Sequence, residues 1–291
     1  MIIKKPILLD GAMGTELVSR GVKFTLPLWS AEANLSNPSL VTNIHQSYAD
    51  EGADIITTNT FRSTAWTYEK SGLDSINAKE RADKSLTAAV DCAQKVRGEI
   101  KIAGSITTID DCYQPERYPG DNIAYDHYGH LVDKLLELGI DLFLIETMGN
   151  LDEIKVALNI LFNKEAEIFL SLILKDSKTL LDGNCLFDVI KIIRSRKVNT
   201  LLNNCNSLET KFEELQTIQD EWGRSWGIYP NLGITNYDNL YLKRISQIKF
   251  EQKMRSILAK KPDIIGLCCG SNINDFKILK KLVEEYYETE D

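Results

Sequence analysis

Long apolar runs are missing from this sequence of 291 residues. The apolar segment before Asp10 is only a few residues long, too short for the core of a signal peptide. No later run approaches the roughly 20 apolar residues of a membrane helix. We therefore expect a cytoplasmic protein with no membrane partner, in a compartment where thiols stay reduced. The six cysteines are then better candidates for metal binding or catalysis than for a disulfide framework.

An excess of positive charge is also missing. Lys and Arg number 34 against 42 Asp and Glu, which gives a net charge of −8. Binding to a phosphate backbone depends on clustered Lys and Arg, so we expect no nucleic-acid partner. Nucleotide-binding loops are disfavoured too, because no GxGxxG follows the first predicted strand and no GxxxxGK[ST] occurs.

Histidine is scarce, and the three that occur, His45, His127 and His130, fall in helical patterns. A histidine metal ligand or a Ser-His-Asp triad is therefore unsupported. Internal repeats, low-complexity tracts and linkers rich in Gly, Pro and Ser are absent as well. We therefore expect a single domain over residues 1–291.

What the sequence does contain is an alternation of short apolar strands and longer helical segments. Several of these strands are apolar nearly throughout, as expected when both faces of a parallel sheet are buried. Eight strands with helices between them predict an α/β fold of the (β/α)8 TIM-barrel type, and a doubly wound open sheet is the main alternative. The predicted strands are Pro6–Asp10, Asp54–Thr58, Lys101–Ile106, Leu142–Glu146, Glu167–Leu174, Thr200–Asn204, Trp226–Pro230 and Asp263–Cys268.

Three cysteines fall at the ends of predicted strands, where barrel enzymes carry their reactive groups. Cys205 follows the sixth strand, and Cys268 and Cys269 end the eighth. Three thiolates suit Zn²⁺ and leave its fourth position open, as in catalytic zinc sites. Adjacent strand residues point to opposite faces, so both neighbours can reach one ion only if the strand breaks, which Gly270 makes plausible. From spacing alone, buried core cysteines explain the pattern about as well.

Two acids, Asp10 and Glu146, also end apolar strands. A buried carboxylate is costly unless it is paired, so these two could hold the ammonium group of an amino acid. For either acid taken alone, a helix cap or an internal salt bridge is the simpler explanation. The remaining cysteines show no comparable placement and are expected to be structural or incidental: Cys92, Cys112 and Cys185. The one long irregular stretch, residues 107–122, follows a strand end, where such loops are often functional lids or mobile segments.

Seven short motifs, in order along nearly the whole chain, resemble those of the homocysteine S-methyltransferase family. They are DGAMGTEL (10–17), TTNTF (57–61), AGS (103–105), ET (146–147), NNC (203–205), YPN (229–231) and LCCG (267–270). The first two look most like the homocysteine module of cobalamin-dependent methionine synthases. The resemblance implies a zinc-dependent barrel enzyme that methylates the thiol of homocysteine to give methionine, with Zn²⁺ held by Cys205, Cys268 and Cys269.

The resemblance also implies how the substrate is held and where the methyl group comes from. Asp10 and Glu146 would hold the ammonium group of homocysteine, and Gly11 and Thr58 would line its pocket. Stand-alone relatives of this length use sulfonium donors such as S-methylmethionine or S-adenosylmethionine, so a sulfonium is the first expectation. A methylcorrinoid delivered by a partner protein is the second, and betaine is the third.

Two further readings remain open at this point. A zinc-holding binding or regulatory barrel could keep the pocket without turnover, as the unusual segment 107–122 suggests. An unrelated barrel enzyme, such as a lyase, could carry the three cysteines as structural residues. The distance between the three sulfur atoms in the fold tests this last alternative.

Overall fold

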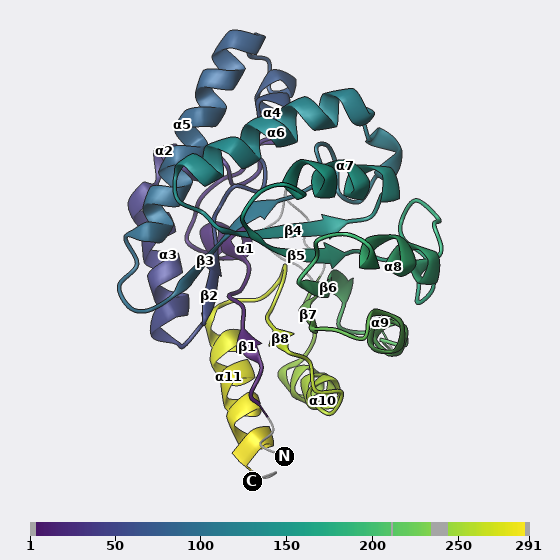
Figure 1. Ribbon diagram of the computed structural model, residues 1–291. Coiled ribbons are helices and arrows are strands. Elements are labelled where there is room, and N and C mark those ends of the chain that lie inside the picture. The colour runs from purple at the N-terminus through teal and green to yellow at the C-terminus, as the bar shows by residue number, and fades with distance from the viewer. Residues whose placement is uncertain (1–3, 211, 234–243, 289–291) are drawn as a thin grey trace.

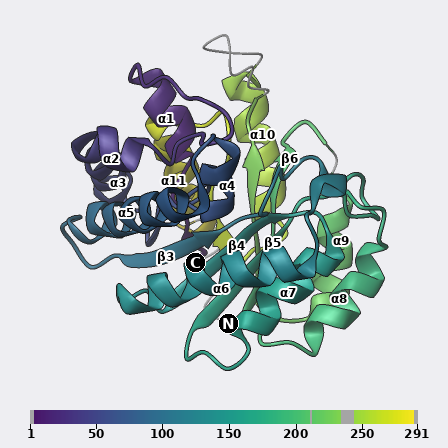
Figure 2. The same ribbon diagram turned by 90° about the horizontal axis from the view of Figure 1, so that it is seen from above.

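The computed structural model of the chain describes residues 4–210, 212–233 and 244–288. Within these residues eight parallel strands form one sheet in the order β1-β8-β7-β6-β5-β4-β3-β2. A single bridge between Leu9 and Ile55 joins the two edge strands, so the sheet is a nearly closed barrel. Helices surround the strands, as two perpendicular views show (Figures 1 and 2). The predicted (β/α)8 barrel is confirmed, and the open sheet is excluded.

The eight strands coincide with the eight predicted segments, with shifted ends. β4 and β6 run further than predicted, so Glu146 and Cys205 lie inside strands rather than at their ends, whereas β1 and β8 are shorter. The strands are β1 Ile7–Leu8, β2 Ile55–Thr57, β3 Lys101–Ile106, β4 Leu142–Met148, β5 Glu167–Leu172, β6 Thr200–Ser207, β7 Trp226–Asn231 and β8 Ile264–Ile265.

The helices begin where their sequence signals lie. Pro38 stands in the first turn of α3, and the Asn150 side chain caps α7 by accepting hydrogen bonds from the backbone N–H groups of Asp152 and Glu153. The helices are α1 Met13–Ser19, α2 Ala33–Ser36, α3 Pro38–Asp50, α4 Ala65–Lys70, α5 Ser75–Gln94, α6 Asp121–Glu137, α7 Leu151–Leu161, α8 Leu186–Arg194, α9 Glu214–Trp222, α10 Gln247–Leu258 and α11 Ile273–Glu288, with the 3-10 helix η1 at Pro115–Arg117.

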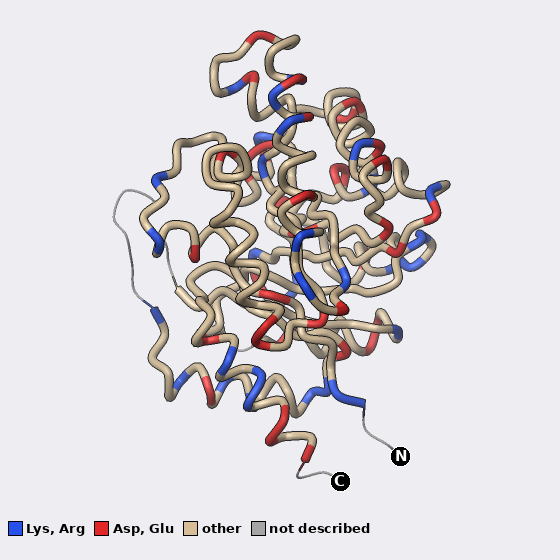
Figure 3. Tube along the Cα trace, turned by 90° about the vertical axis from the view of Figure 1, so that its left-hand side faces the viewer, with Lys and Arg blue, Asp and Glu red and all other residues tan. Residues whose placement is uncertain are grey.

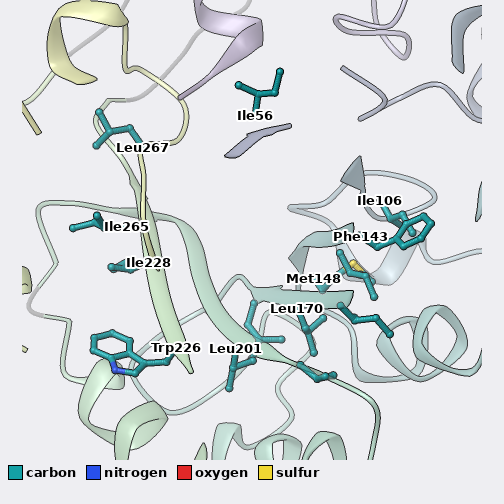
Figure 4. Close-up of a cluster of buried hydrophobic side chains, with 14 of the residues drawn as sticks. Ile56, Ile106, Phe143, Met148, Leu170, Leu201, Trp226, Ile228, Ile265 and Leu267 are labelled. Carbon is teal, nitrogen blue, oxygen red and sulfur yellow. The ribbon is translucent and has the colours of Figure 1, made fainter. Parts of the chain in front are cut away.

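The strands are buried on both faces, as their apolar sequences predict. On β4, Leu142 and Leu144 belong to the cluster inside the barrel, whereas Phe143 and Ile145 pack in the layer between the barrel and the helices. Figure 4 shows part of that outer layer, with side chains from β2 through β8. Each fully buried side chain of this size contributes roughly 1.5–3 kcal/mol to folding. The two layers together hold the strand ends in fixed positions.

The charged residues are interspersed rather than gathered by sign. Figure 3 shows Lys and Arg mixed with Asp and Glu along the trace, several of them on the outer helices. Ion pairs such as Lys249–Glu209 and Arg255–Glu285 join neighbouring segments at the surface. In the described ranges, no helix combines the length and the apolar character needed to span a membrane.

The long segment after β3 is held firmly in place. Glu153 of α7 accepts a hydrogen bond from the Ile109 backbone N–H at 2.7 Å, and the Tyr128 hydroxyl lies 2.8 Å from both Glu153 and the Thr107 carbonyl. The Asp110 carboxylate pairs with Lys70 of α4. Residues 107–114 therefore form a fixed wall over one side of the barrel mouth.

Candidate functional site

A cavity of about 370 Å³ opens at the C-terminal ends of the strands. This volume lies near the lower end of the range for ligand pockets, about 300–1,000 Å³. The cavity lining includes all seven residues predicted from the sequence: Asp10, Gly11, Thr58, Glu146, Cys205, Cys268 and Cys269. The fold therefore brings together residues that lie within β4 and β6 and in the segments that follow β1, β2 and β8.

The three cysteines meet in one cluster. Their sulfur atoms all lie within 4.8 Å of one another. Cys205 and Cys268 are joined as a disulfide, with Cα atoms 5.8 Å apart, and Cys269 is free. Sulfur ligands at about 2.3 Å from one tetrahedral ion lie about 3.8 Å apart, so the donor set fits Zn²⁺ once the pair is reduced. Burial raises the pKa of the Cys269 thiol to about 11, so thiolates here need a cation beside them.

Cys205 reaches the cluster through an irregularity in β6. The pairing of β6 with β7 shifts register between Asn204 and Ser207, and Cys205 has a φ of +55°. Such a bulge adds a residue to one strand and turns its side chains. As a result the neighbours Asn204 and Cys205 both belong to the interior, although strand residues normally alternate.

A turn after β8 presents the other two cysteines. The strand ends at Ile265, the Ser271 N–H bonds to the Cys268 carbonyl at 3.2 Å, and Gly270 has a φ of +83°. A Cβ atom on Gly270 would lie 2.7 Å from the backbone nitrogen of Gly233, which no side chain tolerates. The break expected at Gly270 is confirmed, and it lets adjacent cysteines face one point.

Asp10 is a buried carboxylate that also closes the barrel. Its Oδ2 accepts a hydrogen bond from the Thr57 backbone N–H at 2.9 Å, and its Oδ1 accepts from the Thr57 hydroxyl at 3.0 Å. Burial raises the pKa of Asp10 to about 8, and the nearby Glu146 adds to that rise. A cation is the ligand that would best offset this cost of desolvation.

Glu146 has partners that sequence reasoning missed. Its Oε1 accepts a hydrogen bond from the Ser105 hydroxyl, and its Oε2 lies 3.5 Å from the Tyr229 hydroxyl. Burial raises the pKa of Glu146 to about 7. Ser105 lies in the motif AGS and Tyr229 in the motif YPN, both near the ends of predicted strands. Those positions indicate that the two side chains belong to the site. Nothing in the sequence shows that Glu146 is the residue they contact.

Gly11 and Thr58 both line the cavity, in different ways. A Cβ atom on Gly11 would lie 2.6 Å from the Tyr48 hydroxyl oxygen, so a larger residue there would displace the buried ring. The Thr58 hydroxyl accepts a hydrogen bond from the Ser105 N–H at 3.1 Å and lies 2.9 Å from the Thr60 hydroxyl. Thr58 therefore links the end of β2 to β3. Its hydroxyl is already hydrogen-bonded, so its contribution to the cavity is to the shape of the wall.

The other cysteines differ in their placement. Cys92 is buried in α5 and Cys185 is exposed before α8, in accord with structural or incidental roles. Cys112 corrects the expectation of no special placement, because it is 5% exposed and lies in the cavity wall. The sequence gives no strand end at this position, and only the fixed path of residues 107–114 brings the thiol to the cavity.

Comparisons with known proteins agree with this geometry. The family model described as homocysteine S-methyltransferase matches residues 7–283. The homocysteine S-methyltransferase of Escherichia coli K12 is 30% identical over 246 residues, 80% of this chain and 79% of the relative. The crystal structures of the E. coli homocysteine methyltransferase MmuM in metallated and oxidised forms each superpose with a TM-score of 0.81, at 26% and 27% identity, over 96% of both chains. The chain belongs to the homocysteine S-methyltransferase family.

Proposed function

We propose that the chain transfers a methyl group from a sulfonium donor to the thiol of homocysteine, giving methionine. The observation that carries the proposal is the cluster of three sulfur atoms within 4.8 Å, open to the same cavity as two buried carboxylates. A thiol acceptor and an ammonium group are the two features of homocysteine that such a site matches.

Cys205, Cys268 and Cys269 would hold Zn²⁺ in this proposal, with the Cys205–Cys268 pair reduced. When bound, the ion supplies a positive charge that stabilises thiolates, including the thiolate of a thiol substrate in its open position. Three cysteinates make the site electron-rich, which suits attack by a sulfur nucleophile on a methyl group. The Asn204 amide, 4.0 Å from the Cys268 sulfur, helps to fix the cluster.

Asp10 and Glu146 would bind the ammonium group of homocysteine. Burial raises the pKa of Asp10 to about 8 and that of Glu146 to about 7, and an ammonium group beside them would offset this cost of desolvation. Ser105 and Tyr229 hold Glu146 in place. The same residues orient the amino acid, so that its side chain extends toward the cysteine cluster and away from bulk water.

Metal content and methionine formation test the proposal together. Zinc-loaded protein is incubated with homocysteine and, separately, with S-methylmethionine, S-adenosylmethionine, betaine and a methylcorrinoid protein. We expect about one zinc per chain, and methionine from a sulfonium. Cys268→Ser should lose both zinc and activity, because two cysteines hold zinc poorly at neutral pH.

Cys185→Ser provides the matched control, because Cys185 is an exposed cysteine in the N-cap position of α8, away from the cavity. It should keep the zinc and the rate of the parent protein. Full methionine formation by a metal-free protein would refute the mechanism. Homocysteine binding without methionine from any donor would instead support a barrel that binds its ligand without turnover.

A further inference from the structure

Two of the three clustered cysteines lie on one short turn, residues 268–271, which we call the cysteine turn. Neighbouring backbone groups hold part of it in place. The Cys268 N–H donates a hydrogen bond to the Pro230 carbonyl at 2.9 Å, and the Leu232 N–H donates one to the Cys269 carbonyl at 2.9 Å. Both bonds join backbone groups, so the path of the chain through the barrel provides them whatever side chains are present.

A side chain of α1 holds the cysteine turn at a further point. The Gly270 N–H donates a hydrogen bond to the Thr15 hydroxyl oxygen at 3.1 Å. This N–H belongs to the same peptide group as the Cys269 carbonyl, which the Leu232 N–H already binds. A peptide group is planar, so hydrogen bonds at both its N–H and its C=O fix the plane. That plane in turn determines the direction in which the Cys269 side chain leaves the backbone.

Two other contacts fix the start of α1 against the same part of the chain. The Ala12 N–H donates a hydrogen bond to the Ser271 hydroxyl at 3.3 Å, and the Glu16 carboxylate accepts one from the Ile273 N–H at 2.9 Å. Ser271 and Glu16 are both buried. These contacts hold α1 beside the cysteine turn and the beginning of α11, so the Thr15 hydroxyl is kept within reach of its donor.

Cys269 depends on such a contact more than Cys205 does. Cys205 lies within β6, whose pairing with β7 extends past it. β8 ends at Ile265, so Cys269 lies on a turn and not in a strand. A tetrahedral Zn²⁺ needs every sulfur ligand at about 2.3 Å, and a rotation of the peptide group after Cys269 would move its sulfur atom away from that position.

We propose that Thr15 is a positioning residue of the metal centre, and that its hydroxyl directs Cys269 toward the ion through the Gly270 N–H. The inference rests on the proposed zinc site and adds a residue that acts through the backbone of a ligand. Thr15 and Asp10 belong to the same motif, DGAMGTEL. The segment after β1 therefore serves two purposes, since it carries the carboxylate of the proposed ammonium site and holds a ligand of the proposed ion.

Thr15→Val tests the role of the hydroxyl. Valine has nearly the same size and shape, but it leaves the Gly270 N–H without this acceptor. The affinity of the reduced protein for Zn²⁺, measured by competition with a chelator, should fall about tenfold, because partners that orient metal ligands typically contribute that much. Thr15→Ser keeps a hydroxyl at the same position, so its zinc affinity should stay within about threefold of the parent value.

Ser19→Ala is the matched control. Ser19 is an exposed residue of the same helix, and its hydroxyl donates a hydrogen bond to the Glu16 carbonyl at 2.8 Å, within α1. This variant should keep the zinc affinity of the parent protein within about twofold. If Thr15 had only a structural role, Thr15→Val would lower the free energy of unfolding and leave the zinc affinity of the folded protein unchanged.

Hydrogen exchange of the Gly270 amide gives a readout that needs neither metal nor turnover. In the reduced, metal-free protein, this amide should exchange about tenfold faster in Thr15→Val than in the parent protein, because its hydrogen bond is lost. The exchange rate should be unchanged in Ser19→Ala. Thr15→Ser should restore the slow exchange of the parent protein.

Any of four results would overturn the proposal. They are absence of zinc binding by the parent protein, equal zinc affinity in Thr15→Val, unchanged exchange of the Gly270 amide in Thr15→Val, and a Thr15→Ser variant as impaired as Thr15→Val. Failure of the proposed function alone gives a different outcome. In that case zinc binds with the expected order of affinities, but no methionine forms from any methyl donor.

Discussion

Gly11 illustrates how a single residue shapes the cavity. It lies where the chain leaves β1, and the ring of Tyr48 occupies the space where its side chain would be. Tyr48 is fully buried, and its hydroxyl has no hydrogen-bond partner within the described residues. A larger residue at position 11 would therefore force the buried ring to move.

Gly11→Ala should therefore destabilise the protein by about 1–3 kcal/mol, because the added methyl group forces the buried ring to move. It should also weaken homocysteine binding. Tyr48→Phe removes the hydroxyl, which is the atom nearest to a Cβ at position 11 and has no hydrogen-bond partner among the described residues. This variant alone should change the free energy of unfolding little. Urea unfolding of the two single variants and the double variant measures the loss in the free energy of unfolding. If the loss in the double variant equals the sum of the losses in the single variants, the two residues do not interact.

Many residues of the candidate site could be predicted from the sequence. In a barrel the residues at the C-terminal ends of strands face one mouth, so locating the strands also locates Asp10, Glu146 and the paired cysteines. Their partners were not predictable. Whether Ser105 or another hydroxyl contacts Glu146 depends on the register between β3 and β4, which no local pattern specifies.

At the scale of elements, irregularities in two strands decide the geometry of the site. Thr147 in β4 and Cys205 in β6 have φ values of +60° and +55°, and both strands shift register there. Asn204 joins the two irregularities, because its side chain accepts a hydrogen bond from the Thr147 N–H at 3.0 Å and donates one to the Thr147 hydroxyl at 2.8 Å. The irregularities of β4 and β6 are therefore held together by the Asn204 side chain.

Asn204→Ala should loosen this unit. The variant loses these bonds and one from the Ser171 hydroxyl, which should cost about 2–4 kcal/mol, since buried groups are left unpaired. Zinc affinity, measured by competition with a chelator, should fall about tenfold or more.

Asn199→Ala is the control, because Asn199 accepts a hydrogen bond from the Ile168 N–H at the other end of β6. Asn199→Ala should lower the free energy of unfolding and leave the zinc affinity unchanged. Equal zinc affinity in the two variants would contradict the role of Asn204.

The sequence did not reveal these bulges, although it revealed all eight strands. An apolar run between helices is sufficient to identify a strand in a parallel sheet. A left-handed residue is usually signalled by Gly, Asn or Asp, but here Thr and Cys adopt that conformation. Tertiary contacts impose it, so β4 and β6 were predicted to end too early and Cys205 was expected after its strand.

For the molecule as a whole, buried acids set the dependence of stability on pH. Burial raises the pKa of Glu153 from 4.5 to about 7. Between these pH values the folded protein holds a proton that the unfolded chain has lost, so the free energy of unfolding falls as pH rises. Asp10 and Glu146 act in the same direction.

Glu153→Gln should reduce this pH dependence. Gln can still accept the hydrogen bonds from Ile109 and Tyr128 but does not titrate. Relative to the parent protein, the variant should gain stability between about pH 5 and pH 8, by at most about 3 kcal/mol. Chemical unfolding at a series of pH values measures the gain. A constant difference across that range would show that Glu153 does not carry the effect.

The pairing of β1 has a consequence for how the chain is made. β1 forms its ladder with β8, and Ile7 pairs with Ile264, 257 residues further along. At a synthesis rate of about 5–20 residues per second, the first strand waits roughly 13–50 s on the ribosome for its partner. Asp10 and the paired cysteines therefore meet only after β8 has been translated, and until then the edges of β1 and β7 that β8 will pair with stay uncovered.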